Sequence, residues 1–104
     1  MFRHVVVFNW KPGTSPAAVV AIGDALKACA EAVPVSCTYT CGPDVNLADA
    51  DGRGDRYDFV IVADFEDQVA WKVYDQDAEH NRIRAELIRP IVDSRRTVQF
   101  EIAD

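Results

Sequence analysis

Four segments of the chain have the alternation of apolar side chains that is typical of β-strands. These segments are residues 2–10, 35–41, 57–65 and 97–102. The first and third are rich in β-branched and aromatic residues and have apolar side chains at both odd and even positions. The last alternates simply, which predicts an inward apolar side and an outward polar side. The residues predicted inward are Val98, Phe100 and Ile102, and those predicted outward are Thr97, Gln99 and Glu101.

Two helical regions separate these strands. Apolar residues recur every three or four positions from residue 16 to residue 33, which predicts an amphipathic helix that ends before Pro34. Thr14 or Ser15 can cap its start. A second helical stretch runs to Tyr74, breaks at residues 75–77, and resumes after the capping residue Asp77 over residues 78–89. Residues 42–56 show no periodicity and are predicted to form a loop that is either mobile or functional.

The order of these elements is β-α-β-β-α-β, which is the pattern of a ferredoxin-like α+β fold with an antiparallel sheet. With 104 residues, the chain is expected to form a single domain over residues 1–104. Both helices of this fold lie on one face of the sheet, so apolar side chains on the other face would meet water. Because monomeric proteins rarely expose such a surface, we predict a homodimer that packs sheet against sheet.

Composition argues against several classes of function. With 11 basic and 17 acidic side chains, the chain has a net charge of −6, which is the wrong sign for binding nucleic acid. No apolar run is long enough to span a membrane and no leader peptide is evident, so we expect a cytoplasmic protein without a membrane partner. The spacing of the three cysteines suits neither a disulfide framework nor a zinc site, and we expect no metal and no cofactor.

Short motifs along the whole chain resemble those of the stress-responsive dimeric α/β-barrel (Dabb) family. They are Arg3-His4-Val5-Val6-Val7-Phe8, Trp10-Lys11-Pro12-Gly13-Thr14-Ser15, Gly42-Pro43-Asp44, Tyr57-Asp58-Phe59, the segment from Tyr74 to His80, and Arg89-Pro90. The resemblance implies a ferredoxin-like dimer whose two sheets form a barrel. It does not fix the function, because members of one fold family differ in activity.

One branch of this family, that of olivetolic acid cyclase, is enzymatic and closes a linear polyketide by aldol condensation. The resemblance to it implies that His80 is a catalytic base, that Tyr74 is its catalytic partner, and that His4 matches a histidine of the first strand. A further histidine of that branch falls on Phe59, and its His-Pro-x-His motif is replaced by Asp77-Ala78-Glu79-His80.

The residues themselves leave two roles open for each of these side chains. His80 lies three positions before Ile83 on the apolar side of its predicted helix. A half-buried imidazole there can accept a proton from a carbon beside a carbonyl near neutral pH, or it can simply pack against the sheet. Tyr74 is either its partner or a core residue. His4 either lines a cavity or is a satisfied core histidine.

We predict that His4, Phe59 and Trp71 contact the substrate. Arg95 and Arg96 are predicted to be charges at the solvent or the dimer rim rather than a substrate clamp. The sequence therefore indicates a homodimer that binds a small, largely apolar carbonyl compound. Two functions remain open at this point. The protein is either a cyclase or lyase that needs no cofactor, or a non-catalytic, stress-responsive ligand-binding dimer.

Overall fold

The structure is a computed structural model, and it describes residues 1–47 and 56–103. The elements, in chain order, are β1 (Phe2–Trp10), α1 (Pro16–Ala32), β2 (Cys37–Pro43), β3 (Phe59–Phe65), α2 (Gln68–Asp75), α3 (Ala78–Ile83), the π-helical turn η1 (Arg84–Ile88) and β4 (Val92–Glu101). This order confirms the predicted ferredoxin-like α+β fold. The second helical region is divided in two, as the polar break at residues 75–77 predicted.

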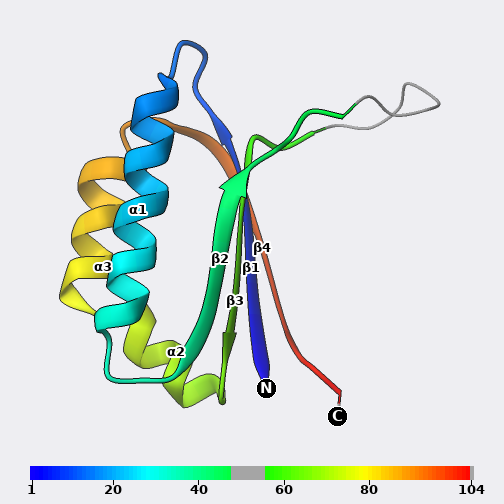
Figure 1. Ribbon diagram of the computed structural model, residues 1–104, viewed down its shortest axis with the longest axis vertical. Helices are drawn as coiled ribbons and strands as arrows, with labels where there is room; N and C mark the ends of the chain where they lie inside the picture. Colours follow the sequence, from blue (N-terminus) through cyan, green and yellow to red (C-terminus); the bar gives the residue numbers. More distant parts are fainter. Residues whose placement is uncertain (48–55, 104) are drawn as a thin grey trace.

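The strands form one antiparallel sheet in the order β2-β3-β1-β4, so β1 and β3 are central and β4 is an edge. Val6 of β1 pairs with Ile61 of β3 on one side and with Thr97 of β4 on the other. The helices all lie on one face of this sheet, and the opposite face is left open (Figure 1). The termini lie near one end of the sheet (Figure 1).

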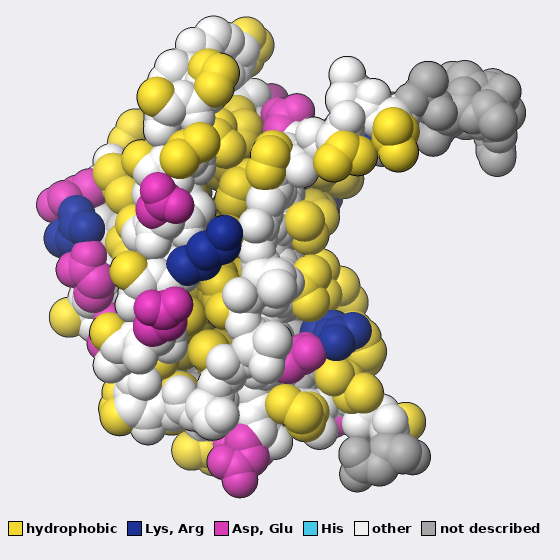
Figure 2. Space-filling model, in the orientation of Figure 1, with side chains coloured by type: hydrophobic (Ala, Val, Ile, Leu, Met, Phe, Trp, Pro, Cys, Tyr) yellow, Lys and Arg dark blue, Asp and Glu magenta, His cyan; other side chains and the backbone are white. Residues whose placement is uncertain are grey.

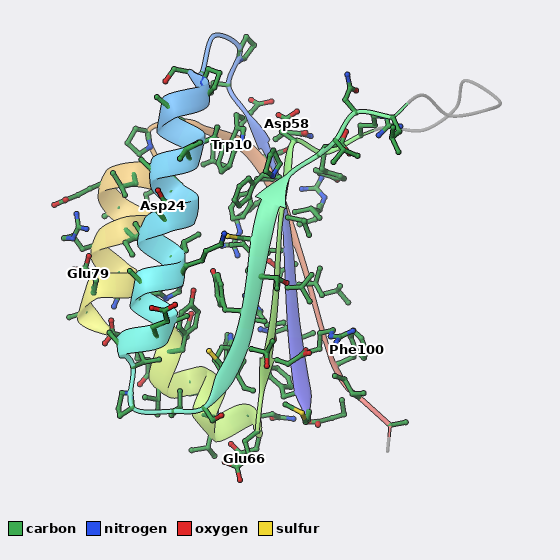
Figure 3. The ribbon with its side chains drawn as sticks, viewed as in Figure 1. Trp10, Asp24, Asp58, Glu66, Glu79 and Phe100 are labelled. Carbon is green, nitrogen blue, oxygen red and sulfur yellow. The ribbon has the colours of Figure 1, made fainter. Side chains whose placement is uncertain are left out.

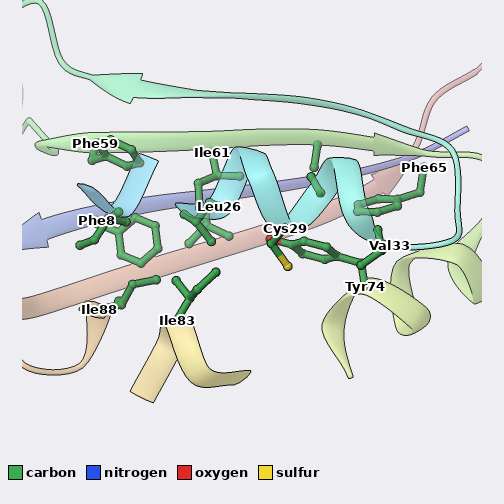
Figure 4. Close-up of a cluster of buried hydrophobic side chains, with 14 of the residues drawn as sticks. Phe8, Leu26, Cys29, Val33, Phe59, Ile61, Phe65, Tyr74, Ile83 and Ile88 are labelled. Carbon is green, nitrogen blue, oxygen red and sulfur yellow. The ribbon is translucent and has the colours of Figure 1, made fainter. Parts of the chain in front are cut away.

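The hydrophobic core fills the layer between the helices and the sheet (Figure 4). The sheet contributes alternate residues of its central strands, among them Phe8 and Phe65, while α1 and α3 contribute Leu26 and Ile83. Leu26, Ile83 and Phe65 are completely shielded from solvent. Burial of such side chains is the main force that holds the helices on this face.

Side-chain caps set the starts of the helices. Ser15 accepts a hydrogen bond from the backbone N–H of Ala18, and Pro16 takes the first helical position, where no N–H is needed. Asp67 accepts from the N–H of Ala70 in the same way at the start of α2. The predicted caps Ser15 and Asp77 are therefore confirmed.

The predicted orientation of the last strand is wrong. Because His4 pairs with Gln99 and Val6 pairs with Thr97, the polar side chains of β4 lie on the helix-covered face. Val98 and Phe100 lie on the open face and are 57% and 45% exposed; Phe100 points away from the helices (Figure 3). The strand also begins at Val92, five positions before the predicted start. Apolar alternation misled the prediction because the open face of this sheet is itself apolar.

That open face includes side chains of three strands. The half-buried or exposed apolar residues on it are Val5, Val7, Val60, Val62, Val98 and Phe100. Figure 2 shows apolar side chains gathered along the curved side of the molecule that is turned away from the helices. The two-sided composition predicted for the first and third strands is thus confirmed.

All three cysteines are free. No helix among the described residues is long and apolar enough to cross a membrane. Of the predicted loop, residues 42 and 43 belong to the end of β2, and residues 48–55 lie outside the described part of the chain.

Candidate functional site

A cavity of about 440 Å³ lies between the helix-covered face of the sheet and the segment from α2 to η1. Its buried lining residues are Val6, Phe8, Leu26, Ile61, Tyr74, His80 and Ile88. Its exposed lining residues are Asn81, Arg89, Arg95, Thr97 and Gln99. The cavity therefore has a mostly apolar floor and a polar mouth. Three of the five mouth residues belong to β4, and two of these, Thr97 and Gln99, were predicted to point outward.

His80 lies in the first turn of α3 and is only 8% exposed. The Asp77 carboxylate accepts the backbone N–H groups of Glu79 and His80, which fixes this turn. The ring Nδ1 of His80 lies 3.3 Å from the carbonyl oxygen of Asp75. Since a carbonyl oxygen only accepts, Nδ1 bears the proton and Nε2 keeps its lone pair. No described residue hydrogen bonds to Nε2, so this nitrogen is available as a base.

The surroundings of His80 keep its ring neutral. Burial lowers the pKa of His80, and the nearby Arg84 guanidinium lowers it further. Arg84 donates to the Asp75 carboxylate at 2.9 Å and to the Asp75 carbonyl oxygen at 2.6 Å. The Asp75 carbonyl oxygen thus accepts hydrogen bonds from both Arg84 and His80, and these bonds connect the end of α2 to the start of α3.

Tyr74, in the last turn of α2, packs its ring against that of His80, with the centroids 4.1 Å apart and the planes tilted by 33°. Its hydroxyl is hydrogen bonded not to His80 but to the hydroxyl of Tyr39 on β2, at 3.1 Å. Burial raises the pKa values of both tyrosines above the ordinary value, so both hydroxyls stay protonated. Once one hydroxyl of the pair donates to the other, the second still has a proton to donate into the cavity.

Tyr39 was not among the predicted site residues. The sequence does place it on the same strand face as Cys37 and Cys41, which are core-facing. That spacing showed that Tyr39 points inward, but it could not show that its hydroxyl meets Tyr74 35 positions later.

His4 of β1 lines the opposite wall of the cavity. The side-chain amide of Gln99 donates to its Nδ1 at 2.8 Å, so the ring proton is on Nε2. Burial, with a smaller contribution from the Arg95 charge, lowers the pKa of His4 to about 4. Its ring also packs against Trp71, with centroids 5.7 Å apart. At neutral pH His4 is therefore a neutral N–H donor, complementary to the lone pair of His80.

The structure brings four of the five predicted site residues together. His80, Tyr74, His4 and Trp71 all line this cavity. Phe59 does not, because it is 3% exposed in the core, where it packs against Phe8 and Trp10. Phe59 instead lines a second pocket, of about 580 Å³, at the other end of α1.

The two arginines of β4 also differ from each other. Arg95 lies on the cavity side, over the ring of Phe8 at 5.9 Å, and is exposed to solvent at the mouth, so the predicted solvent exposure is confirmed. Arg96 pairs with Val7 and lies on the open face. Among the described residues, no group of histidine, cysteine and acidic side chains is arranged to hold a metal ion.

Solved structures with the same fold have been found in bacteria and plants. A dimeric ferredoxin-like protein of unknown function from Thermobifida fusca is 29% identical, with a TM-score of 0.81 over 97% of this chain and 90% of that one. A Dabb protein from Mesorhizobium loti is 17% identical, with a TM-score of 0.76 over 99% of this chain and 97% of that one. A hydroxynitrile lyase from Passiflora edulis is 15% identical, with a TM-score of 0.79 over 99% and 94%.

No curated protein matches this sequence. The profile of the stress responsive A/B barrel domain, Dabb, matches residues 2–102, which is nearly the whole chain. The chain therefore belongs to the Dabb family.

Proposed function

We propose that this protein binds a small carbonyl compound in the cavity and performs acid–base chemistry on it, with His80 as the base. The observation on which this rests is the state of His80. Its ring is buried and neutral, its Nδ1–H is held by the Asp75 carbonyl, and its Nε2 has no partner among the described residues. A base must be unprotonated, oriented and within reach of its substrate, and these contacts meet the first two conditions.

Removal of a proton from a carbon beside a carbonyl places negative charge on the carbonyl oxygen. Neutral hydrogen-bond donors that face this oxygen lower the barrier. Two such donors line the cavity, the hydroxyl pair of Tyr74 and Tyr39 and the Nε2–H of His4. The raised pKa values of the tyrosines and the lowered pKa of His4 keep both donors uncharged at neutral pH.

This arrangement suits an intramolecular aldol cyclisation of the polyketide type. His80 takes a proton from the carbon, the resulting enolate carbon forms a bond to a second carbonyl carbon, and the protonated His80 returns its proton to the new alkoxide. No oxidant, metal or cofactor is needed. The mostly apolar floor favours a substrate with an aliphatic body. A structural neighbour is a hydroxynitrile lyase, so this fold is compatible with an enzyme.

We also propose that the protein is a homodimer, in which the open faces of two sheets meet. Val98, Phe100 and Val60 are exposed on that face, and each is at least 36% exposed. Burial of this apolar face against a second copy would stabilise the dimer by about 25 cal/mol for each Å² of apolar surface removed from water. The Thermobifida fusca neighbour is described as dimeric.

Deuterium exchange tests the proposed base without requiring the natural substrate. In D2O, the wild-type protein should accelerate exchange of the protons beside the carbonyl of 2-nonanone, as followed by NMR. His80→Gln should reduce this rate to that of the buffer while the circular dichroism spectrum is unchanged. His4→Gln is the matched control and should lower the rate by about tenfold or more without abolishing it. Wild-type exchange in the His80→Gln variant would remove His80 from the role.

Cyclisation itself is tested with a linear tetraketide thioester, in which the carbon beside the thioester can attack the distant ketone to close a six-membered ring. The cyclic product is separated from the isomeric linear compound by chromatography and identified by NMR. A wild-type protein that binds such compounds without exchange or cyclisation would instead be a non-catalytic ligand-binding protein.

A further inference from the structure

The charges that line the cavity differ in sign from those of the chain as a whole. The chain has a net charge of −6, and acidic side chains are spread over the helical face of the molecule (Figure 2). Glu79, for example, projects from the side of α3 that is turned away from the sheet (Figure 3). The cavity lining instead includes three arginines, Arg84, Arg89 and Arg95, and one carboxylate, that of Asp75.

These arginines are not equivalent. Arg84 forms an ion pair with Asp75, at 2.9 Å, so its charge is already balanced. Arg89 and Arg95 have no carboxylate partner anywhere in residues 1–47 and 56–103. Both are exposed at the mouth, whereas Tyr74 and His80 lie at the buried floor. Two uncompensated guanidinium groups therefore stand at the entrance of the cavity.

Contacts hold Arg95 on the cavity side of the sheet. Its guanidinium lies over the ring of Phe8, 5.9 Å from the centroid, and donates to the hydroxyl of Thr97 at 3.1 Å. Phe8 and Thr97 also line the cavity. Neither contact neutralises the charge, and a guanidinium that uses one N–H group on a hydroxyl has four left. The planar group can thus still take a carboxylate or phosphate with two parallel hydrogen bonds.

We propose that the ligand of this cavity is an anion, with a carboxylate or phosphate group held at the mouth by Arg89 and Arg95 and an aliphatic body on the floor. This inference rests on the proposed function, which places the ligand in the cavity. It adds that the ligand is negatively charged. In the terms of that function, the substrate is an acidic carbonyl compound, and the acidic group sets which end of it reaches His80.

The test measures the affinity for three probes with the same eight-carbon chain, which are octanoate, octyl phosphate and octanol. Binding to the intact wild-type protein is followed by calorimetry and by the fluorescence of Trp71, which lines the cavity. Octanoate or octyl phosphate should bind at least about tenfold more tightly than octanol, and the stronger of the two identifies the anionic group.

Variants then locate the source of this preference. The double variant Arg89→Gln/Arg95→Gln should lose at least about tenfold of its affinity for the preferred anion and keep its affinity for octanol. Arg96→Gln is the control, because it removes a positive charge from the strand that carries Arg95, but on the open face of the sheet. It should leave the preference intact. Sedimentation of each variant at the working concentration checks that the assembly state is the same.

The outcomes separate the two proposals. Equal affinity for the anions and octanol, or an equal loss in Arg96→Gln, overturns the charge preference and leaves the proposed function standing. Failure of all three probes to bind overturns both, since the cavity would then hold no small aliphatic molecule. Loss of deuterium exchange in His80→Gln combined with equal probe affinities would confirm the base and reject the anion.

Discussion

The rings of Tyr74 and His80 are in contact, with their centroids 4.1 Å apart, although the two residues belong to different helices. Six residues of continuous helix would place them roughly 120° apart around the helix axis and about 9 Å apart along it. The break after Asp75 removes this separation, because α2 ends there and Asp77 caps a new helix. The polar break is therefore the feature that brings the proposed base and its aromatic neighbour to one wall of the cavity.

The hydroxyl of Tyr74 is bonded to Tyr39, so its removal should weaken the donor pair and leave the stacking on His80 intact. We expect Tyr74→Phe to lower deuterium exchange by up to about tenfold and to cost about 1 kcal/mol in the free energy of unfolding. Exchange is measured by NMR and stability by urea unfolding. Tyr39→Phe is the matched control and should have effects of the same size. A complete loss in Tyr74→Phe with no change in Tyr39→Phe would show that the two hydroxyls do not act as a pair.

Asp77 is expected to support both stability and the site. Asp77→Ala removes the carboxylate that holds the N–H groups of Glu79 and His80. The variant should lose about 1 kcal/mol of stability and also exchange activity, because the turn that orients His80 is loosened. Ser15→Ala is the matched control, since it removes a helix cap at the end of α1 away from the cavity. It should lose similar stability and keep full exchange. Equal activity in the two variants would contradict the prediction.

Much of the fold was accessible from the sequence, because each helix boundary depends on local groups such as Ser15, Pro16 and Asp77 that act within one turn. The orientation of β4 was not accessible. Val98 and Phe100 alternate with Thr97 and Gln99, and alternation identifies two faces without saying which one meets the helices. The usual assumption that the apolar side is inward fails here, because the open face is apolar and the cavity wall is polar.

Only part of the candidate site could be proposed from the sequence. His80, Tyr74 and His4 could be proposed by resemblance, since their residue types are present at matching positions. Tyr39 and Arg95 could not. The role of Tyr39 depends on a contact between β2 and α2, and that of Arg95 depends on the strand orientation that was misjudged. The location of Phe59 outside the cavity likewise depends on the register of β3, which no local pattern reveals.

His4 should make stability dependent on pH. Its pKa is about 4 in the folded protein and near 6.5 in the unfolded chain, so the unfolded chain binds more protons between these values. The contribution of His4 to stability is therefore complete above pH 6.5 and is lost as the pH falls toward 4.

Urea unfolding of the wild type and His4→Gln at pH 7 and pH 4.5 isolates this effect. Relative to the variant, the wild type should lose about 2 kcal/mol on acidification, a value reduced for the partial exposure of the ring. The other titrating groups are common to both proteins and cancel in the difference. A constant difference between the two proteins at both pH values would contradict the assignment of a neutral His4.

The open face of the sheet should control assembly. Val98→Glu places a charge at the centre of the proposed interface and should convert the dimer into an 11.6 kDa monomer in sedimentation velocity runs at micromolar concentration. Val20→Glu is the matched control, because Val20 is also an exposed valine, at 62%, but lies on α1. It should remain dimeric. A wild-type protein that sediments as a monomer would exclude the sheet-to-sheet dimer.

The alternation along β4 has a consequence for how proteins of this kind diversify. Positions 95, 97 and 99 face the cavity, and positions 96, 98 and 100 face the opposite side of the sheet. Neighbouring positions on this edge strand therefore lie in unrelated surroundings. Substitutions at the odd positions can retune what enters the cavity while the even positions, and whatever they contact, stay as they were.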